Sequence, residues 1–249
     1  MLEYSVVIPF YNEEENVQPL FVVLKRVMDD LGKTYEVIFV NDGSEDKTLD
    51  ELCSANFSPH RCTVVNLKER YGQSIALEAG LSLAQADTII TLDGDLQNNP
   101  QDIPLLLAKM QEGFDAMCGW RNRRSDSPIK LLASGIANRL RRAIMGENIH
   151  DVGCSLRVFK KSVLHNVHLS KNMHRFFSLI MLKLGYKITE VKIGHYPRRF
   201  GSSKYNIRGR ILPGIKPFFC FAFRDIRHII CKKPQYEIKE IIQFVRSRV

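Results

Sequence analysis

An alternation of short, mostly apolar runs with amphipathic stretches constrains the fold of this 249-residue chain more than any other feature. Residues 13–31 carry apolar side chains at helical spacing on one face, whereas the runs on either side are short and mostly apolar, as buried strands are. The pattern predicts strands at 4–10, 35–40, 63–66, 87–92 and 115–119, and helices at 13–31, 73–84, 101–112 and 128–145. This order predicts an α/β fold with a mostly parallel central sheet and flanking helices.

Polar motifs follow four of these strands at their carboxyl ends, where parallel sheets bind ligands. The motifs are Tyr-Asn-Glu at 11–13, Asn-Asp-Gly-Ser at 41–44, Lys68, and Asp-Gly-Asp at 93–95. Because the carboxyl ends of parallel strands lie at one edge of a sheet, the sequence predicts a single site that these motifs share.

Asp93 and Asp95, separated by Gly94 directly after a buried strand, predict a site for a divalent cation. Mg²⁺ is typically held by one or two carboxylates together with substrate phosphates, and it would offset the charge of a leaving diphosphate. A carboxylate pair in a loop is otherwise only a solvated turn or a helix cap. Gly94 is expected to keep the backbone uncrowded where a nucleotide would pass.

Asp42, at the end of the second strand, has two interpretations that can both hold. Its carboxylate accepts hydrogen bonds from a nucleotide base or ribose, or the loop is a turn in which Ser44 or Asp46 caps the next helix. Tyr11 and Glu13 likewise either flank the base or begin the first helix.

The charge is divided unevenly along the chain. Residues 1–120 sum to −12 and residues 121–249 to +21, which gives the net charge of +9. An acidic half suits a bound cation, and a basic half suits an anion such as a phosphorylated substrate, an anionic membrane or nucleic acid. A solvated basic surface would carry the same charge. Nucleic acid would not explain the carboxylates at the strand ends, so we expect no nucleic-acid partner.

Three segments together resemble the family-2 glycosyltransferases of the GT-A (nucleotide-diphospho-sugar transferase) fold. They are VVIPFYNEEENV at 6–17, VIFVNDGSEDKT at 37–48 and TLDGDLQNNP at 91–100. Four later segments resemble the polyprenyl-phosphate glycosyltransferases, the group that includes dolichol-phosphate mannosyltransferase and its bacterial undecaprenyl-phosphate relatives. They are GWR at 119–121, DVGCSLRVF at 151–159, HRF at 174–176 and RRFGSSKYN at 198–206. The resemblance covers about residues 4–230.

This resemblance implies an inverting transfer of a sugar from a UDP- or GDP-sugar to a polyprenyl phosphate, with Mg²⁺ or Mn²⁺ as cofactor. The implied metal and diphosphate positions are Asp93, Asp95 and Gln97, and the implied nucleotide pocket is Pro9, Tyr11, Glu13 and Asp42. The positions that match those for the acceptor phosphate are Arg121, Lys130 and Ser134, which with Asp93 and Asp95 form the expected catalytic set. The loop that closes over the donor diphosphate is matched by Arg199 and Lys204.

The chemistry of the acceptor determines which catalytic groups the second half of the chain must supply. A hydroxyl acceptor needs a general base, whereas a lipid phosphate is already anionic and needs cations that position it. Asp151 is therefore ambiguous: it orients a cation such as Arg157, contacts the sugar, or serves as a base. A base at this position would favour the alternative function, transfer to a sugar hydroxyl in glycan or lipopolysaccharide synthesis. A catalytically silent nucleotide- or membrane-binding module would not require the intact pair Asp93 and Asp95.

The domain organisation expected from these motifs is a catalytic domain at 1–205, with a donor half at 1–120 and an acceptor half at 121–205. Residues 206–249 are expected to form an amphipathic helical extension near the membrane. In the alternative interpretation, the apolar side chains of this segment pack on the core. The segment 211–231 mixes Phe and Ile with cations too often for a membrane span and is typical of a helix lying in the interface. We expect a cytoplasmic enzyme on the inner face of the membrane, held by peripheral contact or by a separate membrane anchor subunit.

Overall fold

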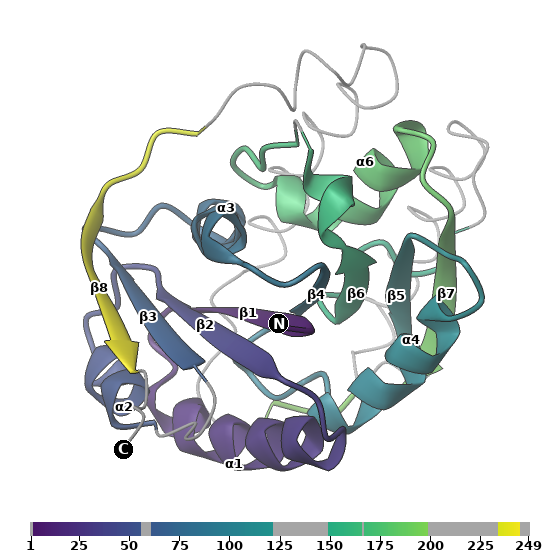
Figure 1. Ribbon diagram of the computed structural model, residues 1–249. Helices are drawn as coiled ribbons and strands as arrows, with labels where there is room; N and C mark the ends of the chain where they lie inside the picture. Colours follow the sequence, from purple (N-terminus) through teal and green to yellow (C-terminus); the bar gives the residue numbers. More distant parts are fainter. Residues whose placement is uncertain (1, 56–60, 122–148, 166, 199–233, 245–249) are drawn as a thin grey trace.

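An eight-stranded mixed sheet organises the part of the chain that the computed structural model describes, which is residues 2–55, 61–121, 149–165, 167–198 and 234–244. The strand order is β7-β5-β6-β4-β1-β2-β3-β8 (Figure 1). The strands are β1 (Tyr4–Phe10), β2 (Tyr35–Asn41), β3 (Arg61–Leu67), β4 (Thr88–Thr91), β5 (Ala116–Arg121), β6 (Arg157–Lys160), β7 (Ile188–Ile193) and β8 (Ile238–Phe244). The five strands predicted in the first half are all present.

Helices cover both faces of this sheet (Figure 1). The α-helices are α1 (Glu14–Asp30), α2 (Thr48–Ser54), α3 (Gln73–Leu83), α4 (Ile103–Met110) and α6 (Phe177–Lys183), and the 3₁₀ turns are η1 (Pro100–Asp102), η2 (Lys161–Leu164) and η3 (Met173–Phe176). The predicted helix at 101–112 therefore begins as a 3₁₀ turn, and Pro104 lies in the first turn of α4. The predicted helix at 128–145 lies outside the described residues. Every described helix falls short of the length and apolarity that a bilayer-spanning helix requires.

The carboxyl ends of β1, β2 and β4 lie at one edge of the sheet because these central strands run parallel. β1 pairs in parallel with β2 and with β4, and β2 pairs in parallel with β3. Together with β5 and β7, four of the seven neighbouring pairs are parallel, whereas β6 and β8 run antiparallel to their neighbours. The sheet is thus parallel where the predicted motifs lie and mixed towards both edges.

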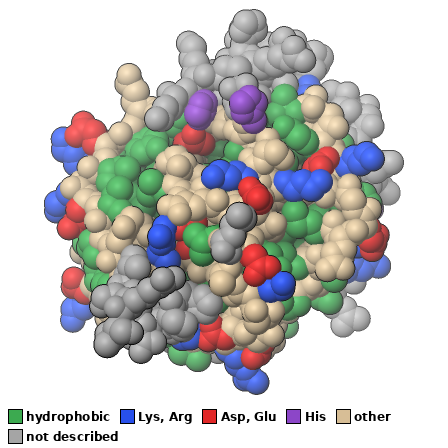
Figure 2. Space-filling view, in the orientation of Figure 1, with side chains coloured by type: hydrophobic (Ala, Val, Ile, Leu, Met, Phe, Trp, Pro, Cys, Tyr) green, Lys and Arg blue, Asp and Glu red, His purple; other side chains and the backbone are tan. Residues whose placement is uncertain are grey.

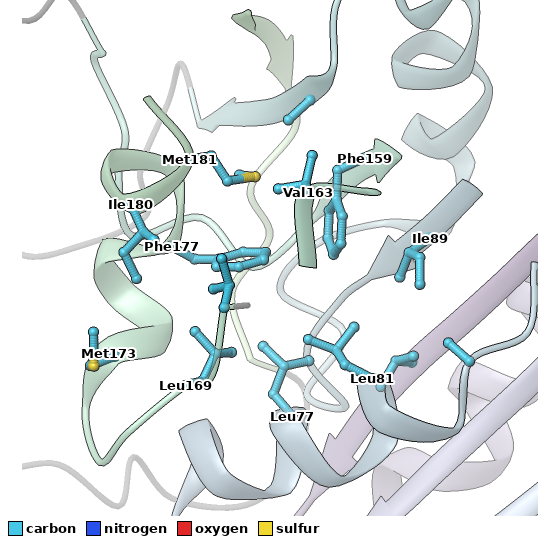
Figure 3. Packing of buried hydrophobic residues seen from close by; sticks show 14 of the residues in the cluster. Leu77, Leu81, Ile89, Phe159, Val163, Leu169, Met173, Phe177, Ile180 and Met181 are labelled. Atoms are coloured by element: carbon cyan, nitrogen blue, oxygen red, sulfur yellow. The ribbon is translucent and has the colours of Figure 1, made fainter. Parts of the chain in front are cut away.

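Successive side chains of a strand point to opposite faces of the sheet, so the core consists of two layers. Val7 and Ile38, which are paired across β1 and β2, belong to the cluster under α3 and α6. Figure 3 shows Leu77 of α3 and Phe177 of α6 in this cluster. Val6 and Val37, one residue earlier, belong to the cluster under α1, α2 and α4. Both faces of β2 are covered, so all seven of its residues are buried. A strand buried on both faces is typically rich in consecutive apolar residues, and Val37–Val40 of β2 show this pattern.

The strand β8 corrects the prediction of a helical extension for residues 238–244. This segment pairs antiparallel with β3 and forms one edge of the sheet. A line of hydrogen bonds runs from Asn41 to Asn66 (2.9 Å) and from Asn66 to Glu240 (2.8 Å), joining β2, β3 and β8. The three isoleucines of β8 favour a strand, and the buried Asn66 amide finds an acceptor there. The rest of the expected extension lies outside the described residues or in the segment 234–237.

The close packing of α3 on the sheet gives a test of this core. A Cβ on Gly80 of α3 would lie 2.9 Å from Val40 Cγ2 and closer still to Val7 Cγ1. Gly80→Ala should lower the free energy of unfolding by about 1–2 kcal/mol, because overpacking costs about 1–3 kcal/mol and exceeds the gain of about 1 kcal/mol in helix propensity. Urea denaturation measures the change, and Ser82→Ala on the exposed face of α3 is the matched control. A more stable Gly80→Ala variant would contradict this packing.

Candidate functional site

The loops after β1 and β2 are joined to each other at the edge of the sheet where the motifs lie. The Asn12 N–H donates to Ser44 Oγ (2.9 Å), and the Glu45 N–H donates back to Asn12 Oδ1 (2.8 Å). The Glu13 N–H donates to Thr48 Oγ1 (2.8 Å) at the start of α2. These contacts fix the ends of two strands as one rigid rim.

Asp42 fastens a third loop to this rim. Its carboxylate, only 3% exposed, accepts the N–H of Tyr71 on Oδ1 (2.7 Å) and the N–H of Gly72 on Oδ2 (2.9 Å). Burial raises the pKa of Asp42 to about 6, although both backbone donors and the charge of Arg70 oppose the shift. Gly43 has a φ of 63°, and a Cβ there would meet the backbone of residues 69 and 70. The structure therefore gives Asp42 a loop-fixing role, and its contact with a nucleotide stays a prediction.

Tyr11 and Pro9 lie beside the same loop. The Arg70 guanidinium carbon lies 4.0 Å from the centre of the Tyr11 ring, a cation–π contact that orients the ring. Pro9 pairs with Val40 of β2 beyond the point where the pairing of β1 with β4 ends, so its missing N–H leaves no gap in that ladder. Both residues are half-buried at the rim, as a nucleotide pocket requires.

Asp93 and Asp95 lie in the loop after β4, and the path of this loop depends on Gly94. A Cβ on Gly94 would lie 2.5 Å from the Phe10 ring of β1. The requirement for glycine thus comes from packing against Phe10, and not from the passage of a nucleotide, which was the expected reason. Leu96 takes a left-handed φ of 57°, which costs a non-glycine residue about 1–2 kcal/mol. The strained turn brings Gln97 back so that its N–H donates to Asp95 Oδ1 (3.1 Å).

The charge of Asp93 is offset from several sides. Burial raises the pKa of Asp93, and the charge of Asp95 raises it further, while a hydrogen bond from Ser155 and the charges of Arg157 and Arg121 oppose the shift. Gln73 at the start of α3 donates its amide N–H to Asp93 Oδ1 (2.5 Å). The negative charge of Asp95, which favours a proton on Asp93, would equally favour a cation held between the two carboxylates.

Arg198 belongs to this site, although no sequence pattern predicted a role for it. Its guanidinium donates to Glu13 Oε1 (3.0 Å) and to Asp95 Oδ2 (2.9 Å), and so connects the loop after β1 with the loop after β4. Its side chain is 21% exposed, while those of Glu13 and Asp95 are 9% and 12% exposed. The adjacent arginines in the RRFGSSK segment were the available signal, but the expected diphosphate contact was assigned to Arg199.

The oxygen ligands of this site fit a hard divalent cation. Across the ranges that the structure describes, no group of three or more His, Cys, Asp or Glu side chains could hold a metal. Asp93 and Asp95 would therefore supply two protein carboxylates, and the remaining ligands would be phosphate and water oxygens, as is usual for Mg²⁺. Gln97 touches Asp95 through its backbone, and its predicted ligand role stays a prediction.

Arg121 and Asp151 form a bidentate pair at the end of β5. The Arg121 Nε donates to Asp151 Oδ2 (2.6 Å) and its Nη2 to Oδ1 (2.8 Å). Burial alone would lower the pKa of Arg121, but the hydrogen bonds and charge of Asp151 raise it, so the guanidinium stays charged. Glu190 of β7 accepts the Asp151 N–H (2.8 Å) and fixes this loop in turn. Asp151 thus orients a cation, as one interpretation held, but the cation is Arg121.

Arg157, which was the cation expected beside Asp151, donates to two backbone carbonyls. It is 2% exposed, and its Nη2 donates to the carbonyls of Val152 (3.3 Å) and His174 (3.1 Å), so it links two loops. Burial lowers the pKa of His174 to about 3, with Arg175 and Arg157 contributing, and this imidazole is neutral. Its Nδ1 lies 2.7 Å from Ser74 Oγ of α3.

The structure thus joins Glu13, Asp95 and Arg198 directly, places Asp93 beside them, and brings Arg121 close enough for its charge to act on Asp93. The other predicted site residues, Lys130, Ser134, Arg199 and Lys204, lie outside the described residues. On the face of the molecule in Figure 2, acidic and basic side chains are interspersed.

Comparison with known proteins gives matches in sequence and in structure. Residues 5–167 match the family model for glycosyl transferase family 2. The chain is 35% identical over 204 residues to undecaprenyl-phosphate 4-deoxy-4-formamido-L-arabinose transferase of Serratia proteamaculans, a match that covers 82% of this chain and 63% of that protein. It is 36% identical over 211 residues to dodecaprenyl-phosphate galacturonate synthase of Rhizobium johnstonii, covering 83% and 62%. The chain therefore spans less than two thirds of the length of both relatives.

Among solved structures, the chain is similar to glucosyl-3-phosphoglycerate synthase from Mycobacterium tuberculosis in complex with Mn²⁺ and UDP-glucose. The TM-score is 0.68 at 17% identity, with 90% of this chain and 80% of that chain covered. At this identity the likeness concerns the fold alone, and it confirms the expected GT-A fold.

If Asp93 holds a cation, the raised pKa of its carboxyl should make the affinity for that cation depend on pH. A carboxyl with a raised pKa still carries a proton where an ordinary aspartate is ionised, and a cation must displace that proton. Mn²⁺ affinity should therefore fall as the pH is lowered from about 7 to 5, more steeply than an unperturbed aspartate with a pKa of about 3.9 would cause. Isothermal titration calorimetry measures this dependence, and Asp93→Asn should flatten it while weakening binding throughout. An affinity that stays constant over this range in the unmodified protein would contradict the assignment of Asp93.

Proposed function

The chain belongs to glycosyl transferase family 2, and from this premise we propose that it transfers a sugar from a UDP- or GDP-sugar to a polyprenyl phosphate with Mg²⁺ or Mn²⁺. The names of the two relatives support the acceptor, because both are polyprenyl-phosphate sugar enzymes. The complex of the structural neighbour with Mn²⁺ and UDP-glucose supports the class of donor and the cofactor.

The donor would lie along the loops that follow β1, β2 and β4. Tyr11 and Pro9 would flank the base, and Asp42 holds the Tyr71–Gly72 backbone beside it. Asp93 and Asp95 would hold the cation, which when bound offsets the charge that develops on the leaving diphosphate. The two carboxylates and the fixed loops position the anomeric carbon relative to the acceptor.

The pairing of Arg121 with Asp151 is the observation that carries the choice of acceptor. Both Asp151 oxygens accept from the guanidinium, at 2.6 and 2.8 Å, so this carboxylate is committed to orienting a cation. An anionic phosphate needs such a cation and needs no base, whereas a sugar hydroxyl must lose a proton as it attacks. Lys130 and Ser134 would contact the same phosphate, and Arg199 and Lys204 would contact the donor diphosphate.

A polyprenyl phosphate is a membrane lipid, so we propose that the enzyme works at the inner face of the membrane. The attachment would be peripheral, through residues 206–233 of the extension predicted at 206–249, or would be provided by a separate membrane subunit. The division into a catalytic domain at 1–205 and a shorter extension remains part of this proposal, with β8 returning to the sheet of the catalytic domain.

Asp95→Asn should abolish transfer. Loss of this ligand removes several kcal/mol of transition-state stabilisation, which corresponds to about a thousandfold in rate. The assay incubates labelled UDP- and GDP-sugars with undecaprenyl phosphate and Mn²⁺ or Mg²⁺, and measures label extracted with the lipid. Asp115→Asn, which removes an equal charge from the start of the β5 region, is the control and should retain activity. Near-normal turnover of Asp95→Asn would contradict the donor site, and label found only in soluble glycan would contradict the acceptor.

Asp151→Asn and Arg121→Gln should act as one unit. If Asp151 works only by orienting Arg121, the double variant should be no slower than Arg121→Gln alone, because the shared contact is lost once. Kinetics with varied lipid phosphate measure this cycle, and the pH profile of Asp151→Asn should keep the shape of the unmodified enzyme's profile. Additive defects, together with loss of the acidic limb of the profile, would identify Asp151 as a base and favour transfer to a sugar hydroxyl.

A further inference from the structure

We propose that Arg198 is an exchangeable counter-ion of the cation site. Its guanidinium competes with the divalent cation for Asp95, and transfer of the guanidinium to the donor diphosphate couples cation binding to donor binding. This inference rests on the proposed function, since it concerns the same carboxylates.

The contacts of Arg198 place a positive charge beside a carboxylate oxygen that would bind the cation, Asp95 Oδ2. Asp95 Oδ1 accepts the Gln97 N–H (3.1 Å), and Oδ2 accepts Arg198 Nη2 (2.9 Å). A cation that binds Oδ2 would lie close to the guanidinium in a site where the Asp95 side chain is only 12% exposed. Two positive charges at such a distance repel strongly when water is largely excluded. Cation binding and the contact between Arg198 and Asp95 therefore oppose each other.

The backbone around Arg198 allows the side chain to exchange partners while the segment stays in place. The Tyr196 N–H donates to the Gln97 carbonyl (3.0 Å), and the Gly194 N–H donates to Asp102 Oδ2 (3.3 Å). These bonds tie the segment before Arg198 to the loop that carries Asp95. Rotation about the long Arg198 side chain is then sufficient to leave Asp95.

A donor diphosphate gives the displaced guanidinium a new partner. The planar fork of arginine matches two phosphate oxygens as well as it matches carboxylates. A cation that arrives alone must break the contact with Asp95 without replacement, whereas a cation that arrives with the diphosphate provides one. Cation and donor should consequently bind with positive cooperativity, and by linkage each should raise the affinity of the other by the same factor.

Arg198→Gln tests this competition through effects of opposite sign. Calorimetry measures the affinity of the unmodified protein and the variant for Mn²⁺ alone, for UDP or GDP alone, and for each in the presence of the other. Without its competitor, Mn²⁺ alone should bind about tenfold tighter, the factor expected if the guanidinium occupies Asp95 about nine-tenths of the time. The nucleotide should bind more weakly, and the cooperativity should shrink.

Two further variants separate competition from a structural role. Arg198→Lys keeps the charge but cannot reach two carboxylates as a fork, so its Mn²⁺ affinity should lie between those of the other two proteins. Arg26→Gln, which removes a cation whose side chain is 81% exposed on α1, should change neither affinity. The unfolding temperature should rise more on addition of Mn²⁺ in Arg198→Gln than in the unmodified protein, because the cation then compensates Glu13 and Asp95.

An Arg198→Gln variant that is folded and binds Mn²⁺ no more tightly than the unmodified protein would overturn the competition. Unchanged cooperativity would overturn the coupling. If the unmodified protein fails to bind Mn²⁺ even in the presence of UDP or GDP, the proposed function is overturned and this inference with it.

Discussion

Burial of several carboxylates at one edge of the sheet is the constraint on which the rest of the site depends. Glu13, Asp42, Asp93 and Asp95 all follow strands of the sheet, and a buried charge is costly unless a donor or an opposite charge accompanies it. Asp42 receives two backbone N–H groups, whereas Glu13 and Asp95 share one guanidinium. The partner of each carboxylate therefore determines its role: a carboxylate that accepts backbone N–H groups fixes a loop, whereas one paired with a side-chain cation could exchange that partner for a metal ion.

The donor half could be predicted from the sequence because its signals are local. Apolar runs and helical spacing define β1, β2, β4 and α3 within a few residues, and parallel pairing then brings the following motifs to one edge. The carboxylates Asp93 and Asp95 were identifiable for the same reason, since each follows a strand directly. The comparison with family members confirms the fold and the family that these motifs indicated.

The features that the sequence did not reveal depend on contacts between distant residues. Arg198 meets Asp95 across 103 positions, and Asp151 meets Arg121 across 30, so spacing along the chain could not name either partner. The need for Gly94 is set by the Phe10 ring on another strand. Residues 238–244 resembled a mixed amphipathic segment, and only the free edge of β3 makes them a strand.

The pairing of β8 with β3 has a consequence for how the chain acquires its structure. Cys62 and Phe244 are register partners although 182 residues separate them, so this contact has a very high contact order. During synthesis, β3 presents an unpaired edge until residues 238–244 have left the ribosome, and such edges promote association with other unfinished chains. β8 can therefore complete the sheet only after the seven other described strands have been synthesised.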